Sequence, residues 1–325
     1  MHGALLVDKH AGVSSFGIIE LLQRELCQQW ECKRKDLPKI GHGGTLDPFA
    51  TGLLVICVGR AVKLARYFLG SDKGYEGVIR FGETTVPGDP TAEVSERTDA
   101  LPSGLPALQE LASRLTAQPY LQTPPMHSAK KKDGRPLYEL ARQGIEVERE
   151  PKLCHLRKFE ISSYDAPRAT FRLDCSSGTY VRTLAQDFGR MQGSLALLES
   201  LRRVASGAFH ASAAMTVEQI AEAMSSQLQW DELPCWIPFD DLLKSFDRAD
   251  ATEDEARALM QGRSNVLFNI LRRTPPGKPE EAPLAIYCKA ALVGIARREN
   301  GVWGMERVFP REPLEMACAS SEQLS

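Results

Sequence analysis

A single carboxylate stands in a glycine-rich loop of this chain, next to a run that has the composition of a buried strand. The loop is GHGGTLDPFATG, residues 41–52, and it leads into LLVICVG. A charged group at such a place costs free energy unless a partner compensates it. Three interpretations of Asp47 follow: the loop binds an anion, the aspartate shapes a turn before Pro48, or its carboxylate takes part in chemistry.

Two known kinds of glycine-rich loop can be tested on the sequence alone. A phosphate-binding P-loop has the pattern GxxxxGK[ST], and the chain contains no GK[ST]. An esterase oxyanion loop of the HGG type works together with a G-x-S-x-G nucleophile, and this pattern does not occur either. Neither phosphate gripping nor ester hydrolysis explains the loop.

The loop resembles the catalytic motif of the TruB family of pseudouridine synthases, which modify uridine in the T loop of tRNA. Other segments resemble further motifs of that family and occur in the same order. They are LLVDKHAGVSS (5–15), SDKGYEGVIRFG (71–82), the long segment from TPPMHSAKKK to EREPK (123–152), CSSGTYVRTLAQDFG (175–189) and LRR (201–203). The resemblance covers residues 3–245 closely and 246–312 loosely. It implies isomerisation of the uridine at position 55 of tRNA, without a cofactor and without a metal.

The resemblance also implies the catalytic residues. The reaction breaks the N1–C1′ bond, turns the uracil and forms a C5–C1′ bond. A carboxylate beside the sugar is the expected agent, and Asp47 matches it. The sequence leaves open whether Asp47 is a nucleophile at C1′ or a base at C2′. Arg182 matches the family's ion-pair partner of the aspartate, since a buried carboxylate needs a cation to stay ionised. Tyr75 matches the tyrosine of the K-x-Y motif.

Further matched positions are expected to hold the RNA. His42 matches the residue that occupies the space left by the flipped uridine, and the Tyr75 ring can stack on the flipped base. Tyr180 and Leu201 match residues that line the uracil pocket. Basic residues of SAKKKDGR are expected to contact phosphates, which position an RNA without specifying its sequence; they are Lys130, Lys132 and Arg135.

The chain departs from the family pattern at several positions outside the catalytic set. In TTVPGDPTA, Val86 stands where an aspartate is usual and Ala92 where a glycine is usual, although Asp89 is kept. Leu195 and Leu197 stand where a glycine and a histidine or tyrosine are common. We expect the first two to affect the conformation of this loop and the leucines to affect fine RNA contacts.

The elements that must position these residues can be predicted from apolar periodicity. ALLVDK (4–9) and LLVICVG (53–59) have the composition of buried strands, and a helix with an apolar face begins after Ser14 or Ser15. Alternating residues predict strands in 154–165 and 169–182. The segments TLAQDFGRMQG (183–193) and LALLESLRRVA (195–205) are predicted to be helical. The mixture of strands and helices predicts the α+β class, and the resemblance implies that the catalytic domain is built around a long mixed or antiparallel sheet.

Composition shifts predict two domains and a tail. The resemblance implies that residues 1–245 form the catalytic domain, with an RNA-contacting insertion at about 123–152, and that residues 246–312 form a small PUA-like β domain that binds RNA. Residues 313–325 are expected to be a disordered tail.

The bulk composition fits a protein of the cytoplasm. The chain has 325 residues, 43% of them hydrophobic, and a net charge of −2. Its eight cysteines and six histidines are dispersed, which predicts a reducing compartment and no structural metal. No apolar run is long enough for a membrane span, and the N-terminal residues lack the pattern of a signal peptide. A tRNA-binding monomer without an obligatory protein partner is the expected form.

Two other functions remain open on the sequence. One is the catalytic subunit of a guide-RNA-dependent H/ACA-type particle, which usually carries basic extensions, whereas the last residues of this chain are acidic on balance. The other is an RNA-binding protein that assists tRNA folding without catalysis. The Asp47–Tyr75–Arg182 set argues against a protein that has lost catalysis.

Overall fold

The computed structural model describes most of the chain and divides it into two compact units, Met1–Ile237 and Pro238–Ser325. The described residues are 2–126, 128, 131–132, 135–226, 228–273 and 283–309. The division therefore falls a few residues before the boundary predicted at 245/246. The tail predicted for 313–325 lies outside the described residues.

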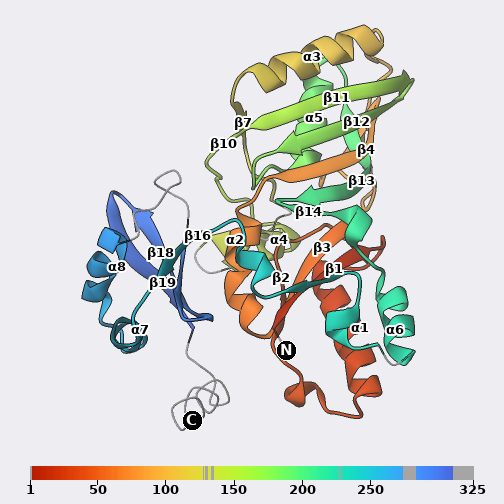
Figure 1. Ribbon diagram of the computed structural model, residues 1–325. Coiled ribbons are helices and arrows are strands. Elements are labelled where there is room, and N and C mark those ends of the chain that lie inside the picture. The colour runs from red at the N-terminus through yellow and green to blue at the C-terminus, as the bar shows by residue number, and fades with distance from the viewer. Residues whose placement is uncertain are drawn as a thin grey trace. The chain divides into compact units, whose positions relative to one another are not determined.

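A nine-stranded sheet forms the framework of the first unit among the described residues (Figure 1). Seven of its strands lie side by side in the order β11 (Leu156–Asp165), β12 (Arg168–Cys175), β4 (Lys73–Phe81), β13 (Ala196–Ser206), β3 (Thr51–Val58), β1 (Gly3–Lys9) and β15 (Trp236–Pro238). Two short strands add to them: β14 (Phe209–His210) pairs with β13, and β2 (Ile40–His42) pairs with β3. Strands β11, β12, β4 and β13 pair antiparallel, as do β3 and β1, whereas β13 and β3 run parallel. The sheet is therefore mixed, as predicted.

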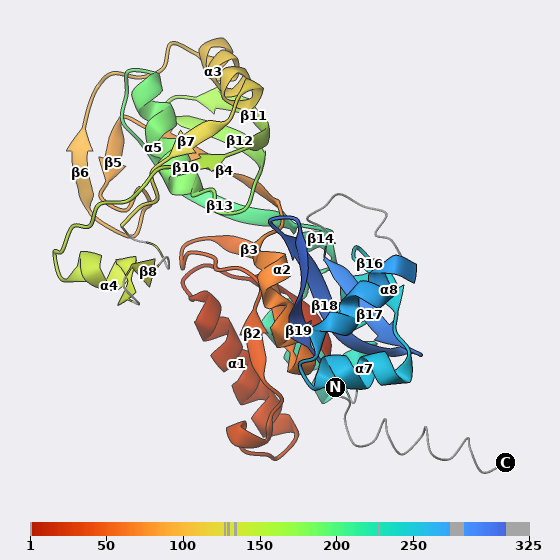
Figure 2. The same ribbon diagram turned by 90° about the vertical axis from the view of Figure 1, so that its left-hand side faces the viewer.

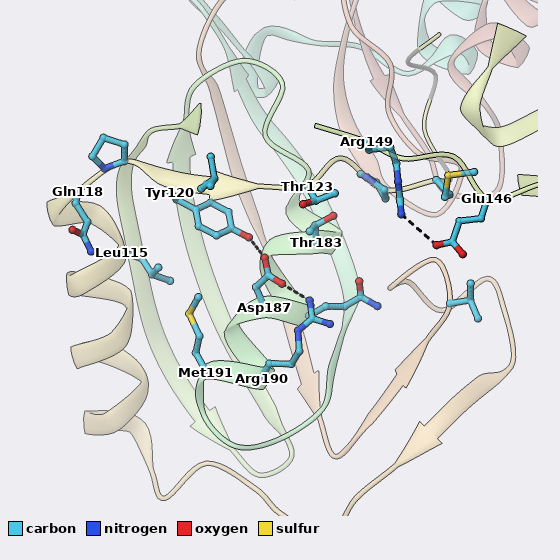
Figure 3. Close-up of a pocket in the computed structure, with 16 residues that line it drawn as sticks. Leu115, Gln118, Tyr120, Thr123, Glu146, Arg149, Thr183, Asp187, Arg190 and Met191 are labelled. Carbon is cyan, nitrogen blue, oxygen red and sulfur yellow. Dashed lines mark hydrogen bonds and ion pairs between the residues drawn. The ribbon is translucent and has the colours of Figure 1, made fainter. Parts of the chain in front are cut away.

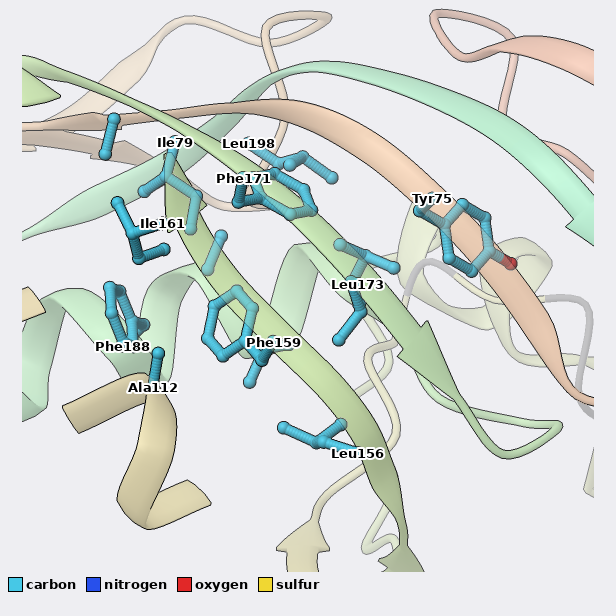
Figure 4. Packing of buried hydrophobic residues seen from close by; sticks show 14 of the residues in the cluster. Tyr75, Ile79, Ala112, Leu156, Phe159, Ile161, Phe171, Leu173, Phe188 and Leu198 are labelled. Atoms are coloured by element: carbon cyan, nitrogen blue, oxygen red, sulfur yellow. The ribbon is translucent and has the colours of Figure 1, made fainter. Parts of the chain in front are cut away.

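Helices pack against this sheet at two places. At the β11 end, α3 (Leu105–Ala117) contacts β11 and α5 (Val181–Met191) contacts β13. Near β1 and β2, α1 (Ser15–Gln29) packs against α6 (Val217–Ser225). The core under α3 and α5 is built of aromatic and branched side chains, and Figure 4 shows Phe159, Phe171 and Phe188 meeting there.

Shorter elements complete the first unit. They are the helices α2 (Ala65–Leu69) and α4 (Leu137–Arg142) and the two-stranded pairs β5 (Glu83–Thr85) with β6 (Val94–Arg97), β7 (Tyr120–Gln122) with β10 (Lys152–Cys154) and β8 (Lys131–Lys132) with β9 (Arg135–Pro136).

The start of α1 follows the sequence prediction. Ser14 is the N-cap, and its hydroxyl accepts a hydrogen bond from the backbone N–H of Gly17 at 2.9 Å. A serine hydroxyl at this place satisfies one of the helix's otherwise unpaired N–H groups. Ser15, the other candidate, is buried, and its hydroxyl bonds to the backbone of Leu46 instead.

The prediction of a helix over residues 195–205 is wrong, because nearly all of this segment belongs to the strand β13. Its leucines, alanines and arginines are good helix formers in isolation. Two strands flank it, however, with β4 on one side and β3 on the other, so its backbone groups are paired in the middle of the sheet. The turn at Gly193, which has a φ of +70°, separates it from the end of α5. Tertiary pairing overrides the local preference here.

The second unit has a sheet and a core of its own. Its strands are β16 (Asp247–Asp250), β17 (Leu284–Cys288), β18 (Ala291–Glu299) and β19 (Val302–Val308), in that order. The helices α7 (Glu253–Met260) and α8 (Leu267–Arg273) lie against this sheet (Figure 2). Small and aliphatic side chains from all these elements except β19 form the buried cluster, on which Trp303 and Met305 of β19 pack. This is the small C-terminal β domain that the sequence predicted, with two helices added.

The described helices are all too short or too polar to span a membrane.

Candidate active site

The loop that carries Asp47 is held between β2, β3 and the start of α1. The buried Ser15 hydroxyl accepts a hydrogen bond from the Leu46 N–H at 2.8 Å and lies 3.1 Å from the Leu46 carbonyl oxygen, to which it can donate. One serine thus satisfies both backbone groups of the residue before Asp47. The loop backbone next to the carboxylate is therefore fixed to an element that lies far from it in the sequence.

Asp47 forms a two-pronged ion pair with Arg182. The Arg182 Nε lies 2.8 Å from Asp47 Oδ2, and Nη2 lies 3.2 Å from Oδ1. Arg182 stands in the first turn of α5, and its side chain is only 5% exposed, whereas that of Asp47 is 34% exposed. Parallel N–H···O bonds of this kind are the strong form of the arginine–carboxylate pair. The pair fixes the direction of the Asp47 carboxylate and leaves part of it open to a ligand.

A second loop holds the other side of Arg182. Its Nη1 donates to the Pro87 carbonyl at 2.8 Å and lies 3.6 Å from Asp89 Oδ2. Asp89 is buried and accepts a hydrogen bond from the Thr91 N–H at 3.0 Å. Val86 is 73% exposed and points away from the core. The loop that contains the unusual Val86 therefore still places two oxygens, from Pro87 and Asp89, next to Arg182. The sequence showed that Asp89 is kept but did not predict that it contacts the site.

Tyr75 lies in the middle of the sheet, close to the catalytic loop. It stands on β4, opposite Leu173 on one neighbouring strand and Arg203 on the other. Its buried ring belongs to the same cluster as Leu46 and Leu201, and Figure 4 shows it at one end of this core. Burial raises the pKa of Tyr75 to about 12, while the nearby Arg203 charge acts in the opposite direction. The hydroxyl is therefore neutral at physiological pH.

The other predicted pocket residues lie on the same framework. Leu201 is buried on β13, two residues before Arg203. Tyr180 is half-buried at the N-cap of α5, and the Gln122 side chain brackets its backbone, accepting from its N–H at 2.7 Å and donating to its carbonyl at 3.0 Å. This clamp fixes the residue that precedes the Arg182 turn.

His42 has an unusual environment at the end of β2. It is half-buried, and its Nδ1 is buried without a hydrogen-bond partner among the described residues. Burial lowers the pKa of His42, and the Arg203 charge lowers it further. A neutral imidazole with an unsatisfied ring nitrogen is suited to contact an incoming ligand.

The basic residues of the insertion are only partly described. Arg135 on β9 is exposed, and its Nη2 donates to Gln143 Oε1 at 2.9 Å. Lys132 lies opposite Arg135 in the β8–β9 pair. Lys130 lies outside the described residues.

Two buried cations near the site escaped the sequence analysis. Lys9, fully buried at the end of β1, donates to the His10 and Pro48 carbonyls at 2.9 and 3.1 Å. Burial lowers the pKa of Lys9 to about 8, against the opposing effect of the Asp47 charge. Arg203 is buried on β13 and donates to backbone carbonyls around the loop. Both residues lie inside recognised motifs, but those motifs alone do not show that the side chains turn inward.

A cavity of about 810 Å³ lies beside α5 (Figure 3). Its charged lining residues are all paired within the lining. Asp187 accepts from Tyr120 and from Arg190, and Arg149 lies 3.7 Å from Glu146. The residues of the Asp47 site do not line this cavity. We therefore place the candidate active site at Asp47 and not in this cavity.

The fold is that of pseudouridine synthases. A solved chain of the archaeal box H/ACA sRNP Nop10–Cbf5 complex superposes with a TM-score of 0.65 and 17% identity, over 95% of this chain and 87% of that one. The model of the TruB family pseudouridylate synthase N-terminal domain matches residues 32–181, and that of the tRNA pseudouridylate synthase B C-terminal domain matches residues 182–249.

Curated relatives agree with these matches. A protein named tRNA pseudouridine synthase B from Burkholderia lata is 36% identical over 309 residues, which are 95% of this chain and 90% of that one. A protein of the same name from Bordetella parapertussis is 42% identical over 241 residues, which are 72% of this chain and 94% of that one. The chain belongs to the TruB family, and the resemblance stated from the motifs is confirmed.

Proposed function

We propose that this protein is a tRNA pseudouridine synthase that isomerises the uridine at position 55 in the T loop. The observation that carries the proposal is the Asp47–Arg182 pair, in which a buried guanidinium holds a carboxylate that remains one-third exposed. Membership of the TruB family and curated relatives named tRNA pseudouridine synthase B support the choice of tRNA as substrate.

Asp47 performs the bond-breaking step in this proposal. As a nucleophile, its oxygen bonds to C1′ while the electron pair of the N1–C1′ bond leaves with the uracil. As a base, it removes the C2′ proton, the C2′–H electron pair forms a C1′=C2′ bond, and the N1–C1′ pair again leaves with the uracil. By either route the negative charge moves from Asp47 to the uracil, which then turns. In the first route C5 bonds to C1′ while the Asp47–C1′ bond breaks and its electron pair returns to the carboxylate. In the second route C5 bonds to C1′ while the C1′=C2′ electron pair takes back the proton from Asp47 at C2′. Loss of the proton at C5 and gain of a proton at N1 complete pseudouridine.

The substrate must be flipped out of the T loop to reach Asp47, at a cost of a few kcal/mol. His42 is proposed to fill the vacated space. Tyr75, Tyr180 and Leu201 are proposed to enclose the uracil, with stacking on an aromatic ring contributing about 1–3 kcal/mol. The phosphates are assigned to Lys130, Lys132 and Arg135.

The protein is further proposed to act alone, as a cytoplasmic monomer that needs no cofactor and no protein partner. A guide-RNA-dependent particle is the second candidate, because a solved chain of an H/ACA complex shares the fold. The curated relatives are twice as similar in sequence and support the first candidate.

The experiment uses the purified protein and an unmodified tRNA transcript. We expect pseudouridine at position 55 with no added RNA or protein. A transcript with cytidine at that position is the matched control. Absence of product from the first transcript, and its appearance only after addition of a guide RNA and partner proteins, would favour the H/ACA-type function.

A further inference from the structure

Three buried cations surround the Asp47 loop and Tyr75. Lys9, Lys73 and Arg203 are each less than a tenth exposed. Within the part of the chain that the structure describes, none of the three pairs with a carboxylate. Lys73 Nζ instead donates to the Phe68 and Ser71 carbonyls at 2.8 and 2.6 Å. A buried charge held only by neutral groups is expensive, so this arrangement calls for a functional explanation.

Arg203 is the member of this group that touches the catalytic parts directly. Its Nη2 donates to the Gly44 carbonyl at 3.1 Å and its Nη1 to the Thr45 carbonyl at 3.2 Å, both in the loop that carries Asp47. Its Nε donates to the Leu53 carbonyl at 2.8 Å, on the strand that follows the loop. One guanidinium therefore ties the two ends of the catalytic loop together.

The same side chain reaches Tyr75. The two residues are opposite each other on neighbouring antiparallel strands, and the charge of the guanidinium acts on the Tyr75 hydroxyl. On its other side, Arg203 is paired with Gly52 of the parallel strand β3. Arg203 thus stands opposite Tyr75 in the sheet while its side chain donates to the backbone of the Asp47 loop.

The charge of Arg203 acts on the whole site. It lowers the pKa of Lys9, Lys73 and His42 and works against the raised pKa of Tyr75. An arginine stays protonated under such conditions. A fixed positive charge in a water-poor interior stabilises negative charge that develops nearby during a reaction.

We propose that Arg203 is a positioning residue of the isomerisation, which fixes the Asp47 loop against Tyr75 and supplies the positive charge that favours transfer of negative charge from Asp47 to the departing uracil. The inference rests on the proposed function. It assigns to the buried guanidinium an electrostatic task that is separate from the pairing of Arg182 with Asp47.

The first test compares Arg203→Met with Arg203→Lys and Lys73→Met. Arg203→Met should slow single-turnover pseudouridine formation about 100-fold, with the Kd for tRNA changed less than about threefold. Arg203→Lys, which keeps the charge, should recover at least about tenfold of the lost rate. Lys73→Met removes a buried cation that does not bond to the loop or to Tyr75, and its rate should stay within about tenfold of the wild type. Thermal unfolding establishes that each variant is folded.

The second test separates electrostatics from loop positioning through the leaving group. Fluorine at C5 withdraws electrons and stabilises the uracil anion, so tRNA containing 5-fluorouridine depends less on help from the protein. If Arg203 stabilises the anion, Arg203→Met should slow glycosidic rearrangement of this substrate by less than about tenfold, against about 100-fold for the uridine substrate. Equal losses on both substrates would overturn the electrostatic role.

The outcomes for the two proposals are distinguishable. A wild-type protein that forms no pseudouridine in tRNA would overturn the proposed function and, with it, this inference. An active wild type together with an equally active Arg203→Met variant would overturn the inference alone.

Discussion

At the scale of single residues, the site is built on an unequal pair. Arg182 is almost wholly enclosed, held from behind by the Pro87 carbonyl and Asp89, while Asp47 keeps a third of its side chain exposed. A reactive carboxylate has to be held in place and within reach at once. The buried guanidinium supplies the first condition and the exposed part of the carboxylate supplies the second.

Asp47→Asn tests the chemical role of the carboxylate. The amide keeps the size of the side chain but can neither attack C1′ nor accept the C2′ proton. Pseudouridine formation should fall by about 1000-fold or more, with tRNA affinity close to that of the wild type. Pseudouridine mapping of the transcript measures the first quantity and filter binding the second. Near-normal turnover of the folded variant would contradict the assigned mechanism.

Buried lysines should make stability depend on pH in an identifiable window. Burial lowers the pKa of Lys73 to about 8 from an ordinary value of 10.5, as it does for Lys9. Between pH 8 and 10.5 the unfolded chain binds more protons than the folded one, so the free energy of unfolding rises with pH. Tyr75 has the opposite effect, because its pKa is raised from 10 to about 12, and it lowers stability from pH 10 upward.

Urea unfolding at pH 7.5 and 9.5 measures this effect in the wild type, in Lys73→Met and in a matched control at an exposed lysine, Lys35→Met. The increase in unfolding free energy between the two pH values should be smaller in Lys73→Met than in the wild type, and unchanged in Lys35→Met. An identical increase in all three proteins would mean that Lys73 keeps its charge throughout this range.

At the scale of elements, the sequence predicted the strands and the helix start that depend on residues close together in the chain. The buried strands β1 and β3 and the Ser14 cap of α1 agree with the apolar runs and the capping residue. The strand β13 was missed because its residues favour a helix and only its neighbours β4 and β3 make it a strand. Lys9 and Arg203 could not be placed for a related reason, since both donate to carbonyls that lie far away in the sequence.

The close pairing of the parallel strands β13 and β3 depends on Gly52. Its φ is +98°, and a Cβ there would lie 2.3 Å from the Arg203 carbonyl oxygen. Gly52→Ala should therefore destabilise the protein by about 3 kcal/mol or more, through strain and a backbone clash. Gly193→Ala is the matched control, because Gly193 also has a positive φ but faces open space, and it should lose only about 1 kcal/mol. Urea unfolding checks both values, and equal losses would remove the clash as an explanation.

At the scale of the whole molecule, the chain is two units with separate cores. The residues assigned to catalysis all belong to the first unit. The relative from Bordetella parapertussis is covered over 94% of its length by only 72% of this chain. A protein of about the size of the first unit therefore carries the curated name tRNA pseudouridine synthase B.

Truncation tests this division of labour. A chain of residues 1–245 should unfold cooperatively and retain single-turnover pseudouridine formation within about tenfold of the full protein, because its core is its own. If the second unit binds RNA, the truncated chain should need a higher tRNA concentration to reach half-maximal rate. Calorimetry and single-turnover kinetics measure these quantities, and a fragment that does not fold would show that the first unit depends on the second.

The pairing of Asp47 with Arg182 has a consequence for the chain while the ribosome is synthesising it. The two residues are 135 positions apart, and a ribosome adds about 5–20 residues per second. A newly made chain therefore carries its aspartate for roughly 7 to 27 s before the arginine has even been synthesised. During that interval the chain has no assembled site, so competence to act on RNA arises only once most of the first unit has left the ribosome.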